Sequence, residues 1–431
     1  MTDKLRRVAV IVGSRIPFCR SNTIYAEKTN LDMLAAAIQG VADRFGLDGE
    51  QMDEVVAGAV TTHSKDWNLA REAVLSTTLS PLTPGITIQQ ACGTSLQAAL
   101  GIAAKISSGQ IECGIAAGTD TTSDAPIVFS RRFSRRLVKL GRARSMSERL
   151  KVLKGLSPAE LKPVPPANGE PRTHLSMGQH CERMAREWNI SREAQDELAV
   201  QSHHAAARAW DEGFFDPLVQ TWGGVARDNN LRPDTDSEQM AKLRTVFGRD
   251  ESATLTAGNS TPLTDGAAGV LLASEEWAAQ RGLPVQAYLT AGRHSAVDFV
   301  NDEGLLMAPT VAVSELLDRS GHNLQDFDFY ELHEAFAAQV LCTLAAWESD
   351  DYCRNRLGRE KAMGAIDRSK LNVKGSSLAV GHPFAATGAR ILGTLSEILS
   401  KQDGPARGLI SVCTAGGMGV AAIVESTDYA V

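Results

Sequence analysis

Four residues that could attack a carbonyl carbon or move a proton lie on glycine-rich or small-residue turns: Cys92, His333, His382 and Cys413. A histidine can accept the proton of a thiol, and the resulting thiolate can attack a thioester. Backbone N–H groups in such turns can stabilise the oxyanion that forms. Each residue alone indicates little, but the four together predict an acyl-transfer site.

Cys92 stands between a predicted strand and a predicted helix. Residues 85–88 favour a short strand, and the small or apolar residues from Thr94 to Lys105 favour a buried helix. The N–H groups and dipole at the start of this helix are expected to favour thiolate over thiol. The alternative is a buried cysteine that acts as a small hydrophobic side chain.

His333 begins the sequence His-Glu-Ala-Phe, directly after the strand-like residues 327–332. A zinc-protease motif would need a histidine at Ala337, so this motif predicts no metal site. His382 lies between Gly381 and Pro383, which predicts a turn that fixes its direction. A histidine that only satisfies its own loop is the alternative.

Cys413 ends the strand-like residues 408–413 and precedes Thr-Ala-Gly-Gly. This turn could place backbone N–H groups around a second thiol, as an oxyanion hole requires. A plain glycine turn beside a buried thiol is the alternative. Because Cys92 and Cys413 both lie where a strand gives way to a small-residue turn, the chain is expected to contain two related halves.

The elements that must position these turns alternate along the chain. Strands are expected at 8–12, 55–60, 113–118, 254–257 and 267–273, and helices at 31–45, 70–79 and 191–210. This alternation predicts an α/β protein with layered sheets.

Composition limits the class of protein. The 431 residues, with 43% hydrophobic and 22% charged residues, indicate a globular protein of more than one domain. A net charge of -7 argues against a nucleic-acid binder. The seven cysteines lack metal-ligand spacing and indicate free thiols in a reducing compartment. No signal peptide and no membrane-length apolar run is evident, so a cytoplasmic location is expected.

A strongly basic segment, residues 131–162, interrupts the alternation and ends at a proline-rich stretch. It could be a solvated surface excursion. It could also be a surface for anionic phosphates, an acidic partner or a membrane face.

The motifs, taken in order, resemble the thiolase family over nearly the full chain. The matching segments are the Cys92 turn, residues 177–180, residues 258–260, residues 333–336, residues 381–383 and the Cys413 turn. Within this family, His-Glu-Ala-Phe, the stretch from Gly381 to Arg390 and the basic insertion look like the thiolase subunit of fatty-acid β-oxidation multienzyme complexes.

The resemblance implies a five-layer αβαβα fold with two duplicated halves. Residues 1–124 and 251–275 would form the N-terminal half, and residues 276–431 the C-terminal half. Residues 125–250 would form an inserted loop domain. A tight homodimer, or a dimer of such dimers, would be the assembled unit.

The resemblance also assigns roles. Cys92 would be the acylated nucleophile, His382 its base, and Cys413 the acid/base that protonates the leaving acetyl carbanion. His333 would help His382 bind the thioester oxygen, and the N–H groups of Cys92 and Ala415 would form a second oxyanion hole. Ala415 replaces a usual glycine, so this donor depends on the backbone angle that alanine can adopt.

Coenzyme A would be a substrate, with no permanently bound cofactor, and Arg232 and Ser260 match positions near CoA. Ser260 could equally be a turn residue. The implied activity is the reversible cleavage of 3-ketoacyl-CoA by CoA. A hydratase/dehydrogenase subunit or a membrane surface could contact the basic segment.

Two rival functions remain open from sequence. A decarboxylating ketosynthase shares the fold and would use Cys92, His333 and His382, but it needs no second thiol, so Cys413 favours a thiolase. A non-catalytic lipid-binding or scaffold subunit would not need the four polar groups.

Overall fold

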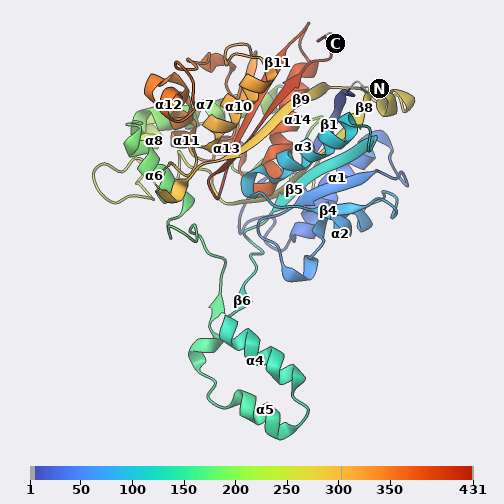
Figure 1. The fold of residues 1–431 in the computed structure, drawn as a ribbon, viewed down its shortest axis with the longest axis vertical. Coiled ribbons are helices and arrows are strands. Elements are labelled where there is room, and N and C mark those ends of the chain that lie inside the picture. Colours follow the sequence, from blue (N-terminus) through green and yellow to red (C-terminus); the bar gives the residue numbers. More distant parts are fainter. Residues whose placement is uncertain (1–4, 302, 430–431) are drawn as a thin grey trace.

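The computed structural model (Figure 1) describes residues 5–301 and 303–429, and ten of its strands form one sheet. The strand order is β10-β11-β12-β9-β1-β8-β5-β3-β4, and the short β2 also pairs with β8. The strands are β1 (Val8–Arg15), β2 (Cys19–Arg20), β3 (Glu54–Gly58), β4 (Gly85–Thr87), β5 (Cys113–Asp120), β8 (Thr264–Ser274), β9 (Ala287–Ala296), β10 (Phe329–Leu332), β11 (Arg407–Thr414) and β12 (Met418–Glu425).

Two halves of this path repeat one topology. In β3-β5-β8-β1 the first pair is parallel and the next two are antiparallel, and β10-β11-β12-β9 has the same order and directions. Within the sheet of the described residues, the halves join where Ala9 and Val10 pair with Tyr288 and Ala287. The duplication expected from sequence is therefore present in the strand pairing.

The duplication does not relate Cys92 to Cys413, as the sequence pattern suggested. Cys92 precedes helix α3 (Thr94–Ser107), whose counterpart in the second half is α14 (Thr387–Ser400), the helix that follows His382. Cys413 lies near the end of β11, the counterpart of β5. The two turns that carry Cys92 and His382 are thus the related pair.

Helices cover the sheets in five layers. Helices α1 (Asn30–Phe45) and α2 (Leu69–Leu75) pack on the outer face of the first half, and α10 (Ala308–Ser320) and α11 (Ala337–Glu348) pack on the outer face of the second. Helices α3 and α14 lie in the central core with residues from both groups of strands. Because β5 and β8 are covered on both faces, every residue in them is buried.

The central helices approach each other closely. A Cβ atom at Gly388 of α14 would lie 2.4 Å from the backbone nitrogen of Leu96 in α3. The Ala389 backbone N–H donates to the Ser95 hydroxyl across the same contact, at 2.8 Å. This contact fixes the starts of α3 and α14, and hence Cys92 and His382, next to each other.

Most expected elements are present, with shifted ends. The expected strand 254–257 is reduced to a single antiparallel bridge between Thr256 and Thr245. It goes no further because the N–H groups of Thr254 and Leu255 donate to the buried Glu182 carboxylate. The helix expected at 191–210 is α7 (Arg192–Asp211), capped by Ser191. Shorter helices complete the fold: α6 (Met177–Glu187), α8 (Ser237–Ala241), α9 (Glu275–Gln280), α12 (Asp350–Asn355) and α13 (Ser377–Val380).

The basic segment forms a helical hairpin that extends far from the layered body (Figure 1). Its helices are α4 (Arg131–Arg142) and α5 (Met146–Leu153), and neither has a buried residue. Strands β6 (Val128–Phe129) and β7 (Pro163–Val164) pair at its base. The pair of Arg136 and Glu160, at 2.6 Å, holds the hairpin together.

Among the helices of residues 5–301 and 303–429, none is both long enough and apolar enough to cross a bilayer.

Candidate active site

Cys92 lies in the 3₁₀ turn Ala91–Gly93 that leads directly into α3. Ala91 has a φ of 45°, in the left-handed region that side chains other than glycine rarely adopt. Such strain persists only where the surrounding structure enforces it, and it occurs often at functional turns. The turn places the half-buried Cys92 at the start of a buried helix.

His382 lies against Cys92. Its Nε2 lies 3.2 Å from the Cys92 Sγ, although the two residues are 290 positions apart. The Thr264 hydroxyl accepts the His382 backbone N–H at 2.7 Å. Gly381, with a φ of 102°, allows the turn, and a Cβ there would meet Thr264.

A hydroxyl sets the proton position on His382. Its Nδ1 lies 2.5 Å from the Thr387 Oγ1, and that hydroxyl donates to the Pro383 carbonyl at 3.3 Å. Because the Thr387 proton is used there, its oxygen accepts from Nδ1–H. The Nε2 lone pair therefore faces the thiol and can accept its proton.

His333 lies on the other side of His382. Their ring centroids are 4.1 Å apart, and the His333 Nδ1 lies 2.8 Å from the Ser377 hydroxyl. Within the described parts of the chain, the buried His333 Nε2 has no hydrogen-bond partner. Cys92 Sγ and one ring nitrogen of each histidine all lie within 4.8 Å of one another.

Cys413 is buried beside Cys92. Cys413 packs in a cluster with Cys181, Met184 and Phe336. Burial raises the pKa of the Cys413 thiol well above its ordinary value, and the nearby Cys92 raises it further. Cys413 is therefore a protonated thiol at neutral pH.

The Ala415 backbone faces the same place. The N–H groups of Ala415 and Cys92 both act to lower the pKa of the Cys92 thiol, so both point toward its sulfur. Ala415 is not among the described residues with a positive φ, whereas Gly416 and Gly417 are. Alanine is thus compatible with the backbone donor that this position offers.

The net effect on Cys92 differs from the sequence-based expectation. Burial outweighs the backbone N–H groups and raises the pKa of Cys92 to about 12. Burial also lowers the pKa of His382 to about 3, with a smaller contribution from Arg390. The resting pair is neutral thiol and neutral imidazole, so the thiolate forms by proton transfer to His382 and not by helix stabilisation alone.

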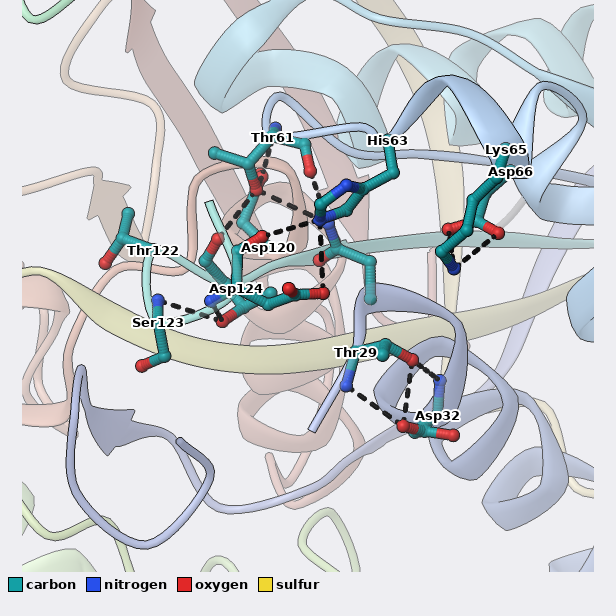
Figure 2. Close-up of polar contacts among 12 residues, drawn as sticks. Thr29, Asp32, Thr61, His63, Lys65, Asp66, Asp120, Thr122, Ser123 and Asp124 are labelled. Carbon is teal, nitrogen blue, oxygen red and sulfur yellow. Dashed lines mark hydrogen bonds and ion pairs between the residues drawn. The ribbon is translucent and has the colours of Figure 1, made fainter. Parts of the chain in front are cut away.

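Asp120, at the end of β5, holds the loops around the site together. Its buried carboxylate accepts from the N–H groups of Val60 and Thr61, from the Thr61 hydroxyl and from the Ala385 N–H. Figure 2 shows Asp120 beside Thr61. Because Ala385 follows His382 in the same turn, this carboxylate ties the base to the first half of the protein.

The two residues expected near CoA occupy different settings. Ser260 is buried and forms a bridge with Phe336, next to His-Glu-Ala-Phe, and its hydroxyl has no partner within residues 5–301 and 303–429. Arg232 is exposed, and its backbone N–H donates to His203. Their role in CoA binding stays a prediction.

Sequence reasoning missed the residues that orient the site. Thr264, Thr387, Ser377 and Asp120 all contact the catalytic turns. For two of them, the place in the sequence could have indicated a role. Thr387 lies within the His382 motif, and Asp120 follows the carboxyl end of a predicted buried strand.

The geometry defines a class: a duplicated α/β protein with a thiol, a base with a free lone pair and a second thiol, which is suited to acyl transfer through a cysteine. Comparison with known proteins gives the family. The model of the thiolase N-terminal domain matches residues 8–276, and that of the thiolase C-terminal domain matches residues 284–426. The chain belongs to the thiolase family.

Relatives and solved structures agree with this membership. The chain is 42% identical over 426 residues to the 3-ketoacyl-CoA thiolase of Yersinia enterocolitica, covering 97% of each chain. A Bacillus anthracis acetyl-CoA acetyltransferase superposes with a TM-score of 0.81 at 27% identity, covering 99% of this chain and 100% of that chain. Human mitochondrial 3-ketoacyl-CoA thiolase in complex with CoA gives a TM-score of 0.80 at 27% identity, covering 98% and 99%.

Proposed function

We propose that this enzyme cleaves 3-ketoacyl-CoA with CoA to acetyl-CoA and a shortened acyl-CoA, in fatty-acid β-oxidation. The 3.2 Å contact between Cys92 Sγ and the unprotonated Nε2 of His382 is the observation that carries the proposal. The 42% identity to a 3-ketoacyl-CoA thiolase over nearly the full chain supports the substrate class.

In the first step, His382 Nε2 takes the Cys92 proton as the sulfur attacks the 3-keto carbon. The N–H groups of Cys92 and Ala415 point toward the sulfur and support a role as donors to the oxygen of the bond being formed. The bond between the second and third carbons then breaks and leaves the acyl group on Cys92.

The broken bond leaves a carbanion on acetyl-CoA, which needs a proton. Cys413 is a protonated thiol next to Cys92, so it can donate that proton. His382 and His333 would donate to the thioester oxygen and stabilise the enolate character of the leaving group. The Cys413 thiolate then takes the proton of a CoA thiol as that thiol attacks the acyl-cysteine, and Cys92 leaves with the proton that His382 returns as the new acyl-CoA forms.

Coenzyme A is a substrate in this scheme and no permanent cofactor is needed. The proposed CoA contacts are the exposed Arg232 and the buried Ser260 beside Phe336, whose hydroxyl has no partner among the described residues. We propose residues 125–250 as an inserted loop domain between 1–124 and 251–275, with 276–431 as the second half. All seven cysteines are free, which supports a reducing cytoplasmic location.

A homodimer, alone or as a dimer of dimers, is the proposed assembly. Strand β4 lies at the end of the strand path, and Ile86 in it is 41% exposed. Trp67 and Leu82 nearby in sequence are 88% and 72% exposed. An exposed strand edge with apolar side chains supports pairing with a second copy. Sedimentation of an Ile86→Lys variant should show loss of the dimer, and an unchanged mass would contradict this interface.

The Cys92→Ser variant tests the function. Incubation with a 3-ketoacyl-CoA should give an acyl adduct on the wild-type protein, seen by intact mass, and none on the variant. Cys353→Ser is the matched control, because the Cys353 sulfur lies 3.5 Å from the Ala346 carbonyl, where a serine hydroxyl can donate equally well. An undiminished adduct on Cys92→Ser would overturn the assignment.

A further inference from the structure

A buried serine, Ser377, links His333 to the buried Arg390. Ser377, at the first position of α13, is fully buried, and its Oγ lies 2.8 Å from the His333 Nδ1. The Arg390 Nη2 donates to the same oxygen at 2.7 Å. Since a guanidinium can only donate, it supplies no acceptor for the Ser377 proton.

Among residues 5–301 and 303–429, His333 Nδ1 is the acceptor available to the Ser377 hydroxyl. A buried hydroxyl proton without an acceptor would cost about 1–3 kcal/mol, so the proton is directed at Nδ1. Nδ1 is then the unprotonated nitrogen of a neutral ring. Nε2 carries the hydrogen, and this is the ring nitrogen that has no protein partner.

We propose that Arg390 and Ser377 form a positioning relay that fixes the Nε2–H tautomer of His333 and so makes its free N–H a donor to the thioester oxygen. The relay deepens the proposed function, because it rests on His333 as an oxyanion donor. It gives the two histidines opposite tasks: Thr387 holds His382 as a proton acceptor, and Ser377 holds His333 as a hydrogen-bond donor.

The surroundings of Arg390 support this role. Arg390 is 4% exposed, its Nη1 donates to Ser376 at 3.2 Å, and its Nε has no partner in the described residues. The Glu331 and Glu334 carboxyls lie near enough to favour the charged guanidinium, but neither hydrogen-bonds to it among the described residues. Its directed contacts there are the two serine hydroxyls, which it can orient. Burial, His382 and Arg390 together lower the pKa of His333 well below its ordinary value, which keeps the ring neutral.

The tautomer itself can be observed. In protein labelled with ¹⁵N-histidine, long-range ¹H–¹⁵N spectra distinguish protonated from unprotonated ring nitrogens, and a His333→Asn variant assigns the signals. Wild type should show His333 protonated at Nε2. Ser377→Ala should lose that preference, and Ser377→Thr, which keeps the hydroxyl, should restore it.

Kinetics provide the second measurement. Ser377→Ala should lower kcat for 3-ketoacyl-CoA cleavage about tenfold with KM within about twofold, since one oxyanion donor is weakened. Ser396→Ala is the matched control, because the buried Ser396 hydroxyl on α14 has no partner in the described parts of the chain. It should leave both the tautomer and kcat unchanged.

Two results would overturn the relay: protonation of His333 at Nδ1 in the wild type, or an unaltered Nε2–H tautomer in Ser377→Ala. A shifted tautomer with unchanged kcat would support the relay and instead contradict the proposed oxyanion role of His333.

Discussion

At the scale of single residues, the site works with two neutral side chains. Burial raises the pKa of Cys92 to about 12 and lowers that of His382 to about 3, so neither ionises alone near neutral pH. In the proposed mechanism, the reactive ion pair forms only as the sulfur attacks. The pair thereby protects the thiol from adventitious oxidation, which requires thiolate.

Replacement of Cys413 by alanine should separate the two half-reactions. Cys413→Ala should still accept an acyl group from a simple thioester, because Cys92 and His382 are intact. It should lose Claisen condensation by about 10²–10⁴-fold, the usual contribution of a placed acid/base. Cys181→Ala, in the same buried cluster, controls for the cavity. Unchanged condensation in Cys413→Ala would contradict its acid/base role.

Glu331, two residues before His333, gives a pH-dependent stability. Its carboxyl is buried without a hydrogen-bond partner in the described chain, and burial raises its pKa to about 8. The unfolded chain releases this proton near pH 4.5, the folded chain only near 8, so stability falls as pH rises through that window.

Glu331→Gln removes this titration. The thermal midpoint of the variant minus that of wild type should therefore be larger at pH 8.5 than at pH 5. The corresponding change in unfolding free energy is up to a few kcal/mol, at roughly 1.4 kcal/mol per pKa unit. If the variant and wild type differ in thermal midpoint by the same amount at both pH values, Glu331 does not titrate in this range.

At the scale of elements, the contact between α3 and α14 brings Cys92 to His382. Gly388→Ala would place a methyl group against the Leu96 backbone, which cannot yield as a side-chain tip can. We expect loss of about 1–3 kcal/mol of stability, as for overpacking in general, and loss of acylation with it. Urea unfolding and burst-phase acylation measure both.

A matched glycine lies on the facing helix. Gly101 in α3 has no atom within 4 Å of the position its Cβ would take, so Gly101→Ala should stabilise the protein by about 0.5–1 kcal/mol and leave acylation unchanged. If Gly388→Ala and Gly101→Ala affected acylation equally, the contact between α3 and α14 would not be what positions Cys92 and His382.

Elements with strong burial patterns could be predicted from sequence, and those held by particular side chains could not. Helices α1 and α3 follow from their apolar spacing, whereas residues 254–257 form only one bridge because Glu182 takes two of their N–H groups. The same holds in the site: Cys92 and His382 have recognisable chemistry, but Ser377 and Asp120 gain their roles only from residues distant in sequence.

At the scale of the whole molecule, charge is strongly segregated. The chain carries a net charge of -7, yet residues 131–162 contain eleven Lys or Arg and only two Glu. These cations lie on a hairpin that extends away from the body (Figure 1). The same hairpin carries exposed apolar side chains. Val138, Met146 and Leu150 are 56%, 68% and 63% exposed. Cations beside exposed apolar groups match an anionic lipid surface.

We therefore propose that the hairpin makes peripheral contact with anionic membranes, and that a hydratase/dehydrogenase subunit is the other candidate for this surface. Replacement of residues 131–162 by a short glycine-serine linker should abolish co-sedimentation with phosphatidylglycerol vesicles. Cleavage of a short-chain 3-ketoacyl-CoA should stay within about twofold, because α4 and α5 bury no residue.

A charge variant separates the attraction from the fold of the hairpin. Arg131, Arg132 and Arg135 make no ion pair among the described residues, so their joint replacement by glutamine leaves the Arg136–Glu160 contact intact. Binding to vesicles should weaken by about 1 kcal/mol for each charge removed, and it should weaken similarly in high salt because surface electrostatics are screened. Both candidate partners would use the same arginines, but only the lipid surface requires the exposed apolar side chains. If the wild-type protein does not bind anionic vesicles but does bind a hydratase/dehydrogenase subunit through these arginines, the hairpin is the docking site for that subunit.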